Sequence, residues 1–196
     1  MTPVRPATAA DVPATAAALA RAFHDDPVTR WVYGADAGRR DRWSSRFFAW
    51  QLRRLLDQDV SWTTAAGDGA AMWALPDRWR EGPADVLRLL VATLPGIAPR
   101  LPRVLRGLAQ VEARHPERRH LYLAVLGVDP PRQGGGVGSA LLAPGLELCD
   151  RDGLPAYLET ATERNVAFYT RHGFRVTGEV RLPKGPPVWL MWRDPR

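Results

Sequence analysis

Two residue types are nearly missing from this sequence: its 196 residues include one cysteine, Cys149, and one lysine, Lys184. A lone cysteine forms no intramolecular disulfide and supplies no cysteine-based zinc site. Lysine and arginine together number 27, so 27 less the single lysine leaves 26 arginines, set among 21 acidic residues for a net charge of +6. The near-total use of arginine, beside many alanines, glycines and prolines, is typical of a GC-rich genome. We therefore expect no nucleic-acid partner, and a mild positive field suits a small anionic ligand.

A long apolar run is also absent. A membrane-spanning helix needs about 18 or more apolar residues, whereas the best apolar stretch, 86–94, contains Arg88 and stops at Pro95. The alanine-rich N-terminus carries Arg5 and Asp11, where a secretory signal peptide would be uninterrupted. These absences predict a cytoplasmic protein with no membrane partner. At 45% hydrophobic and 24% charged residues, the composition is typical of a globular chain.

The first half of the chain predicts helices and strands without a repeat or a linker. Apolar residues recur at helical spacing in two stretches, and a turn containing Asp-Gly, at 67–69, joins two short strand-like runs. A third helical stretch contains Pro95, Pro99 and Pro102, which should interrupt it. The expected elements are a strand at 4–7, helices at 10–24 and 39–57, hairpin strands at 60–66 and 70–75, and the interrupted helix at 81–110.

The second half follows the order strand, glycine-rich turn, helix, strand, helix and hairpin. Two buried strands joined by a crossover helix are typical of a parallel pair, and the last hairpin adds antiparallel strands. We therefore predict one α/β domain with a mixed central β-sheet and helices on both faces. The expected strands lie at 121–128, 154–160, 174–182 and 188–193, and the expected helices at 136–152 and 163–172.

The most informative stretch is the turn at 133–138, Gln-Gly-Gly-Gly-Val-Gly, between a strand and a helix. Glycines let the backbone approach a ligand closely, and free N–H groups at a helix N-terminus attract anions, so phosphate is the natural ligand. A P-loop is excluded because no Lys-Ser/Thr pair follows the glycines. The dinucleotide-binding pattern Gly-x-Gly-x-x-Gly/Ala also fails. Its last position would fall on Ser139 if the pattern began at Gly134, and on Leu141 if it began at Gly136.

Three motifs resemble those of the GNAT superfamily of acetyl-CoA-dependent N-acetyltransferases. The turn at 133–138 fits the pattern Gln/Arg-x-x-Gly-x-Gly/Ala, 126–130 is similar to the family's fourth strand, and Asn165 with the motif at 168–174 is similar to a later signature. The resemblance implies that amides of the turn hold the coenzyme A pyrophosphate, and that two strand amides bind the pantetheine arm and the acetyl carbonyl. The implied cofactor-binding residues are Leu126, Val128, Gln133, Gly134, Gly135, Gly136, Val137, Gly138, Ser139 and Asn165.

The same resemblance divides the chain into an acceptor-side half, 1–118, and an acetyl-CoA-binding half, 119–196. Acetyl transfer to an amine needs a base for the amine proton and an acid for the leaving thiolate. Tyr169 lies four residues after Asn165, so both project from one helix face. The resemblance makes Tyr169 the general acid and Asn165 a partner of the cofactor arm. The residues alone also allow a packed aromatic at 169 and a helix cap at 165.

Glu159 is the candidate base or amine anchor. It lies near the end of a buried strand, where an isolated carboxylate is costly unless it has a role, and pairing with an arginine is the alternative. The candidates for contact with the acceptor are one acidic and three aromatic residues, although most tryptophans of such a chain belong to its core. These candidates are Asp26, Trp31, Tyr33 and Trp73.

No metal is expected. His115 and His120 are five residues apart, with no carboxylate at ligand spacing. Cys149 is flanked by apolar residues inside a predicted helix and is expected to be a small core residue.

The predicted function is acetyl transfer from acetyl-CoA to the amine of a small molecule, by direct attack in a ternary complex. A further resemblance, to puromycin N-acetyltransferases, spans most of the chain on motifs such as 7–13, Pro144-Gly145 and 158–160. It implies an aminonucleoside antibiotic as acceptor and a role in antibiotic resistance. Acetylation of a peptide or protein, and a non-catalytic CoA-binding module, stay open as alternatives. The oligomeric state, with a homodimer as one option, is also open.

Overall fold

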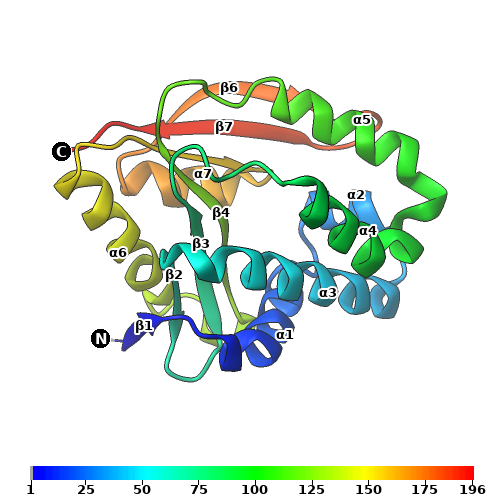
Figure 1. Ribbon diagram of the computed structural model, residues 1–196, viewed down its shortest axis with the longest axis horizontal. Coiled ribbons are helices and arrows are strands. Elements are labelled where there is room, and N and C mark those ends of the chain that lie inside the picture. The colour runs from blue at the N-terminus through cyan, green and yellow to red at the C-terminus, as the bar shows by residue number, and fades with distance from the viewer. Residues whose placement is uncertain (1) are drawn as a thin grey trace.

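One mixed sheet of seven strands organises the chain in the computed structural model, which describes residues 2–196. The strand order is β1-β2-β3-β4-β5-β7-β6; β4 and β5 run parallel, and every other neighbouring pair is antiparallel (Figure 1). The strands are β1 (Val4–Pro6), β2 (Ser61–Thr64), β3 (Gly69–Ala74), β4 (Leu121–Val128), β5 (Ala156–Thr160), β6 (Arg175–Arg181) and β7 (Pro187–Arg193).

Helices cover both faces of this sheet, which confirms the predicted α/β fold class. In β3, Ala71 and Trp73 pack in one cluster with α6 and α7, whereas Ala70, Met72 and Ala74 pack in another with α1 and α3. Because successive side chains of a strand point to opposite faces, each face has its own core. The helices are α1 (Val12–Ala22), α2 (Pro27–Tyr33), α3 (Ala37–Leu55), α4 (Pro83–Ile97), α5 (Leu101–Glu112), α6 (Val137–Arg151) and α7 (Glu163–Arg171).

The expected break at the first proline of the third helical stretch is wrong. Helix α4 contains Pro95 in its last turn and ends at Ile97, and a 3-10 turn, Ala98–Arg100, leads into α5. A proline this close to a helix end removes one intrahelical hydrogen bond without stopping the helix. Within residues 2–196, we find no helix that combines the length and the apolar character needed to cross a lipid bilayer.

β4 and β5 pair along only part of their length. Positions 121–123 of β4 pair with 156–158 of β5. Beyond these positions β4 continues to Val128 and β5 to Thr160 without pairing with each other. A bulge opposite Met72 and Trp73 adds a residue to β4, and such a bulge bends and twists its strand. The two strands therefore separate towards their carboxyl ends and leave a gap in the sheet.

Candidate functional site

The glycine-rich turn follows β4 and opens α6. Gln133 closes it, because its side-chain amide donates to the Val128 carbonyl over 2.9 Å. Gly134 and Gly136 have φ values of 81° and 79°, which residues other than glycine rarely adopt. A Cβ atom at either position, or at Gly135, would meet open space. The turn is therefore an exposed loop whose backbone conformation favours glycine.

A row of unpaired amides lines this turn. From Gly134 to Ser139 we find no backbone acceptor for the N–H groups within the described chain, and Ala140 is the first to donate in helical fashion, to Gly136. The amide of Gln133 donates to the Pro130 carbonyl over 3.2 Å, so the free donors begin at Gly134. Consecutive N–H groups at the start of a helix suit phosphate oxygens.

Helix α7 packs beside the start of α6. A Cβ at Gly138 would lie 3.5 Å from the ring of Phe168. The next residue, Tyr169, is 7% exposed and lies in the same cluster as Val128, with its ring edge-on to Phe168 and Phe174. Burial raises the pKa of Tyr169, so its phenol stays protonated and can act only as a proton donor near neutral pH.

Asn165 is not the cap of α7. The cap is Thr162, whose hydroxyl accepts from the Asn165 backbone amide over 3.3 Å. The Asn165 side chain is half-buried and makes no hydrogen bond that we find in residues 2–196, so it is free to contact a ligand. The Ser139 hydroxyl lies 2.9 Å from His172 Nε2. Ser139 can therefore contribute its backbone amide, and not its hydroxyl, to the row of free donors in the turn.

Glu159 lies on the other face of the sheet, one residue beyond the last β4–β5 pair. Its neighbour Leu158 packs with α6 and α7, so strand alternation aims Glu159 away from them. Its Oε2 accepts from the Tyr122 hydroxyl over 2.7 Å, and its Oε1 lies 3.6 Å from His115 Nδ1. These close partners are a tyrosine and a histidine, instead of the arginine that the sequence allowed.

Two histidines fix the protons of this cluster. His120 Nδ1 lies 2.6 Å from the Arg118 carbonyl and therefore donates to it, which leaves His120 Nε2 to accept from His115 Nε2 over 2.9 Å. His115 Nδ1 and Glu159 Oε1 then face each other with one position between them for a proton. The imidazole and the carboxylate therefore lie side by side, with an acceptor atom of each facing the other.

Aromatic rings enclose the same cluster. Trp79 stacks on His115 with 3.6 Å between ring centroids, and the Tyr157 hydroxyl is buried without a hydrogen-bond partner. Burial raises the pKa of Tyr122 and of Tyr157 and lowers the pKa of His120. The neutral forms of these three groups are therefore favoured beside the Glu159–His115 pair.

Sequence reasoning missed most of this cluster. It considered His115 and His120 only as metal ligands, rejected them in that role, and did not single out Tyr122. The available signal was parallel pairing: Tyr122 and Tyr157 are register partners, so they share a face with Glu159. The two histidines come from the connection between α5 and β4, whose path depends on tertiary packing.

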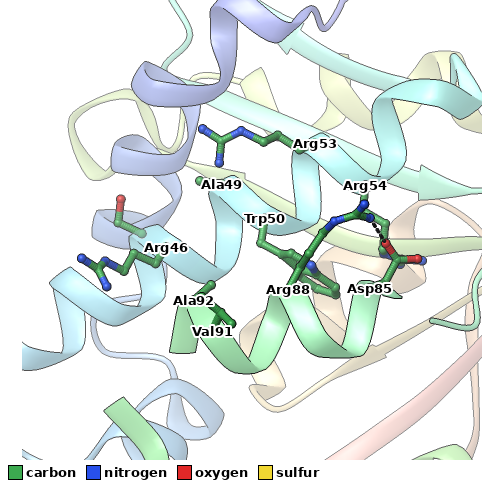
Figure 2. A pocket seen from close by; sticks show the side chains of 10 residues that line it. Arg46, Ala49, Trp50, Arg53, Arg54, Asp85, Arg88, Val91 and Ala92 are labelled. Atoms are coloured by element: carbon green, nitrogen blue, oxygen red, sulfur yellow. Dashed lines mark hydrogen bonds and ion pairs between the residues drawn. The ribbon is translucent and has the colours of Figure 1, made fainter. Parts of the chain in front are cut away.

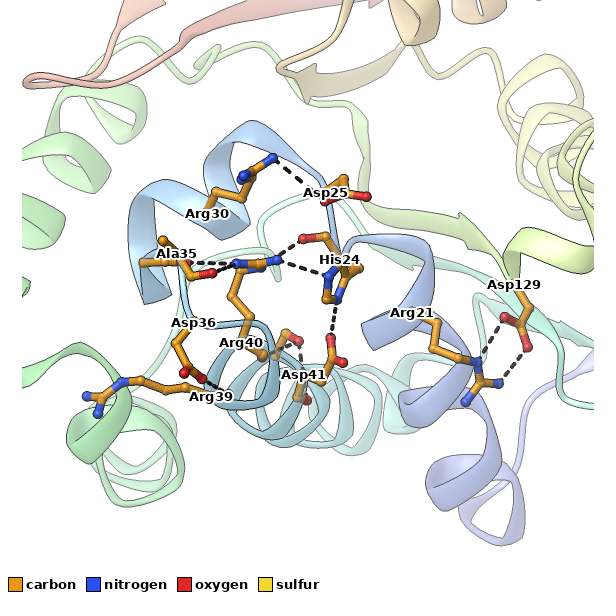
Figure 3. A network of polar contacts seen from close by, with 12 residues as sticks. Arg21, His24, Asp25, Arg30, Ala35, Asp36, Arg39, Arg40, Asp41 and Asp129 are labelled. Carbon is orange, nitrogen blue, oxygen red and sulfur yellow. Dashed lines mark hydrogen bonds and ion pairs between the residues drawn. The ribbon is translucent and has the colours of Figure 1, made fainter.

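The break after α1 has a structural role (Figure 3). The Asp26 carboxylate caps α2 by accepting from the amides of Val28 and Thr29 over 2.9 and 3.0 Å, and burial raises its pKa. Oδ1 of Asp26 is therefore already used by the helix cap. In the same break, His24 Nδ1 lies 2.6 Å from an Asp41 oxygen.

The three aromatic candidates do not form one pocket. Trp31, Tyr33 and Trp73 fall in three different buried clusters. Trp73 is fully buried on the α6 face, where a Cβ at Gly145 would come within 2.3 Å of its ring. Of the three, Trp31 lines a surface hollow, between α2 and the turn after β6.

A larger hollow, of about 690 Å³, lies between α3 and α4 (Figure 2). It contains none of the predicted site residues. Its lining is made of Ser45, Arg46, Ala49, Trp50, Arg53, Arg54, Asp85, Arg88, Val91 and Ala92.

Asp129 and Cys149 are structural. Arg21 donates two hydrogen bonds to the Asp129 carboxylate, over 3.0 and 2.5 Å, and links α1 to the end of β4 (Figure 3). Burial raises the pKa of Cys149 to about 12, which makes it a poor nucleophile. Across the described residues, we find no group of three or more His, Cys, Asp or Glu side chains able to hold a metal ion.

Comparison with known proteins agrees with this geometry. Residues 96–174 match the acetyltransferase (GNAT) family. The crystal structure of a histone acetyltransferase HPA2 and related acetyltransferase from Corynebacterium glutamicum is similar over 100% of this chain and 98% of that chain, with a TM-score of 0.70 and 27% identity. The chain therefore has the single-domain α/β fold of the GNAT acetyltransferases.

Curated relatives match over shorter segments. An uncharacterised N-acetyltransferase of Schizosaccharomyces pombe is 34% identical over 77 residues, which are 38% of this chain and 31% of that protein. The mycothiol acetyltransferase of Streptomyces coelicolor is 42% identical over 71 residues, 35% of this chain and 23% of that protein. The matches thus span less than a third of these relatives. Together, these comparisons show that residues 96–174 are similar to the GNAT acetyltransferase family and that the chain has the GNAT fold.

Proposed function

We propose that the protein transfers an acetyl group from acetyl-CoA to the amine of a small molecule, by direct attack in a ternary complex. The observation that carries this proposal is the gap between β4 and β5, with free amides on one side and the half-buried carboxylate of Glu159 on the other. The coenzyme would supply an acetyl thioester. The acceptor amine would approach from the face of the sheet that carries Glu159.

The cofactor-binding half, 119–196, would hold the coenzyme mainly through backbone groups. Free amides from Gly134 to Ser139 suit the pyrophosphate. The amide of Leu121 donates to the carbonyl of Pro155, the residue before β5. The bulge then shifts strand alternation by one residue, which aims the amides of Leu126 and Val128 towards the gap. There they would bind the pantetheine arm and the acetyl oxygen.

Proton transfer would use groups on opposite sides of the sheet. The Glu159–His115 pair would accept the proton that the attacking amine loses as its nitrogen bonds to the acetyl carbon. When the carbon–sulfur bond breaks, Tyr169 would give its phenolic proton to the departing thiolate. The net reaction converts an amine and a thioester into an amide and a thiol. The amine loses one proton to the Glu159–His115 pair, and the thiolate gains one proton from Tyr169.

For the acceptor, we propose an aminonucleoside such as puromycin, supported by the sequence resemblance alone. The acceptor-side half, 1–118, contributes to the same proposal through His115, which reaches Glu159 from the connection after α5. The match to mycothiol acetyltransferase over 71 residues supports acetyl transfer and leaves the acceptor unassigned.

The test is thiol release from acetyl-CoA by the purified protein, with and without puromycin, followed by mass spectrometry of the product. We expect one added acetyl group on the free amine, and none on puromycin whose amine is already blocked. Turnover of other small amines but not puromycin would remove the aminonucleoside proposal. Turnover confined to peptides would replace the small-molecule acceptor with a peptide. Binding of acetyl-CoA without turnover of any amine or peptide would leave a coenzyme-binding module.

A further inference from the structure

A hollow of about 400 Å³ between α2, the Ala98–Arg100 turn and the turn after β6 carries an unusual set of charges. Four of its nine lining residues are cationic and none is acidic, within the described part of the chain: Arg30, Arg100, Arg103 and Lys184. Like charges repel, so gathering them costs free energy unless an anion completes the set. We call this hollow the cationic pocket.

Few carboxylates offset this charge. Asp25 lies 3.7 Å from Arg30, and both side chains are largely exposed, so water weakens their attraction. Arg100 and Arg103 have no ion pair that we find within residues 2–196. The Nε of Arg103 is buried and has no hydrogen-bond partner among residues 2–196, which is costly for a charged group.

The wall of the pocket is built by close packing. Trp31 is buried, and its indole N–H donates to the Pro183 carbonyl over 2.9 Å. Gly185 allows the turn after β6 to lie against this ring, since a Cβ there would come within 2.5 Å of it. The Arg103 guanidinium stacks 5.2 Å from the same ring and donates to the Trp31 carbonyl over 2.7 Å. Arg103 is thereby held against the pocket wall.

Backbone strain places the single lysine of the chain at this pocket. Lys184 has a φ of 49°, in the left-handed region that costs a non-glycine residue about 1 kcal/mol or more. It sits in a turn whose next residue, Gly185, has no side chain. Strain of this kind persists where the surrounding structure holds the residue in place.

The pocket adjoins the end of the sheet that carries the proposed base. Trp31 belongs to the same buried cluster as Ala161, which follows Glu159 by two residues. The wall of the pocket and the end of the strand that carries the proposed base therefore meet in one buried cluster.

We propose that the cationic pocket binds an anionic group, a carboxylate or a phosphate, carried by the acceptor molecule. The assignment of the anion to the acceptor rests on the proposed acetyl transfer. The existence of an anion site does not depend on that proposal. The acceptor is then an amine with an acidic group at its far end. Puromycin itself has no such group, so among aminonucleosides this inference selects a phosphorylated form. The pocket sets specificity through charge-assisted hydrogen bonds from guanidinium and ammonium groups.

The first experiment uses inorganic phosphate as the probe and needs no turnover. Thermal melting is measured with increasing phosphate, against chloride at matched ionic strength, for the wild type, Lys184→Gly, Arg100→Gln and Arg151→Gln. Lys184→Gly also relieves the positive φ, so a loss of phosphate binding cannot be blamed on misfolding. Arg151, at the far end of α6 beside Asp152, gives a control with the same change of charge.

We expect phosphate to raise the melting temperature of the wild type and of Arg151→Gln, with about tenfold weaker binding in the two pocket variants. Equal phosphate binding in all four proteins, or none in the wild type, would overturn the anion site.

The second experiment separates an anionic acceptor from a free anion. Acetylation rates are compared for pairs of amines that differ only in a terminal group, carboxylate against amide and phosphate against hydroxyl. We expect the anionic member to have the lower KM, and Lys184→Gly to raise that KM about tenfold while leaving the KM of the neutral member unchanged.

Phosphate binding without a preference for anionic amines would overturn the assignment to the acceptor. A higher KM for acetyl-CoA in Lys184→Gly would assign the pocket to the coenzyme instead. If no amine is acetylated, the proposed function fails, and the phosphate titration still decides the anion site.

Discussion

The two faces of the sheet at the β4–β5 gap are built in opposite ways. The α6–α7 face presents backbone amides from one continuous stretch, Gly134 to Ser139. The other face presents side chains from separate segments, with Glu159 on β5, Tyr122 on β4 and His115 in the connection before β4. Backbone donors carry no titratable proton, whereas the carboxylate and imidazole do. One face is therefore suited to hold a ligand, and the other to move a proton.

This difference predicts that substitutions on the two faces affect different measurements. Changes on the amide face should alter the affinity for coenzyme, and changes on the side-chain face should alter the rate of the chemical step. Tyr169 is the informative exception, because it is buried on the amide face but is proposed to donate a proton.

The largest expected effect is that of Glu159→Gln. The amide oxygen can still accept from Tyr122, but the side chain can no longer take a proton. We expect kcat to fall about 100-fold or more, with the Kd for acetyl-CoA unchanged by titration calorimetry. Glu179→Gln, an exposed site on β6, is the matched control. A normal kcat in Glu159→Gln would show that the side-chain face does not supply the base.

Tyr169→Phe is expected to come next. It removes one hydroxyl from a buried ring and keeps the packing against Phe168 and Phe174. We expect kcat to fall at least about tenfold, with little change in coenzyme affinity. The control is Tyr33→Phe, a buried tyrosine in a different cluster. If the two variants turn over equally, Tyr169 is a packing residue and the exception disappears.

A smaller effect is expected at the turn itself. Gly136→Ala puts a side chain at a φ of 79°, which costs about 1–2 kcal/mol of stability and displaces the amides around it. We expect the Kd for acetyl-CoA to rise about fivefold, because misplacing one or two donors costs about 1 kcal/mol. Gly153→Ala, at a φ of 63° and also in open space, should lose similar stability in thermal melting and no affinity. Equal affinity losses in both would mean that the turn does not bind the coenzyme.

The last effect concerns the scaffold of the amide face, is expected in stability and not in catalysis, and depends on pH. Asp150 on α6 accepts two hydrogen bonds, over 2.8 and 2.7 Å, from the buried Arg193 of β7, and these lower the pKa of Asp150. Because the folded pKa lies below the unfolded value of about 3.9, the stabilisation is present above that pH and is lost as pH falls through the folded pKa. Asp150→Asn should therefore lower stability by about 1–2 kcal/mol at pH 7, and by less at pH 3.

Chemical unfolding at the two pH values checks this prediction. Asp152→Asn is the comparison, because its partner Arg151 is exposed and surface pairs contribute about 0–1 kcal/mol. A loss in Asp150→Asn that is equal at pH 3 and pH 7 would show that the ion pair is not its cause.

Local patterns in the sequence determined the elements and the amide face. The hydrophobic runs at 121–128 and 156–160 gave strands because apolar, β-branched and aromatic residues fit a buried sheet. The glycine turn was legible because a backbone site needs only consecutive residues with the right φ values. The fold adds that a local 3-10 turn uses the amide of Gln133 as a donor.

The tertiary structure decided everything that depends on long-range neighbours. It separated Trp31, Tyr33 and Trp73 into three clusters, although all three are aromatic residues of the same half. It also brought His115 to Glu159 across 44 positions of sequence, with 159 less 115 giving that separation. Helical and strand periodicity depends on neighbours a few residues apart, whereas such contacts depend on how whole elements pack. For this reason the sequence predicted the glycine-rich turn, and only the fold brought Tyr122 and His115 to Glu159 and formed the cationic pocket.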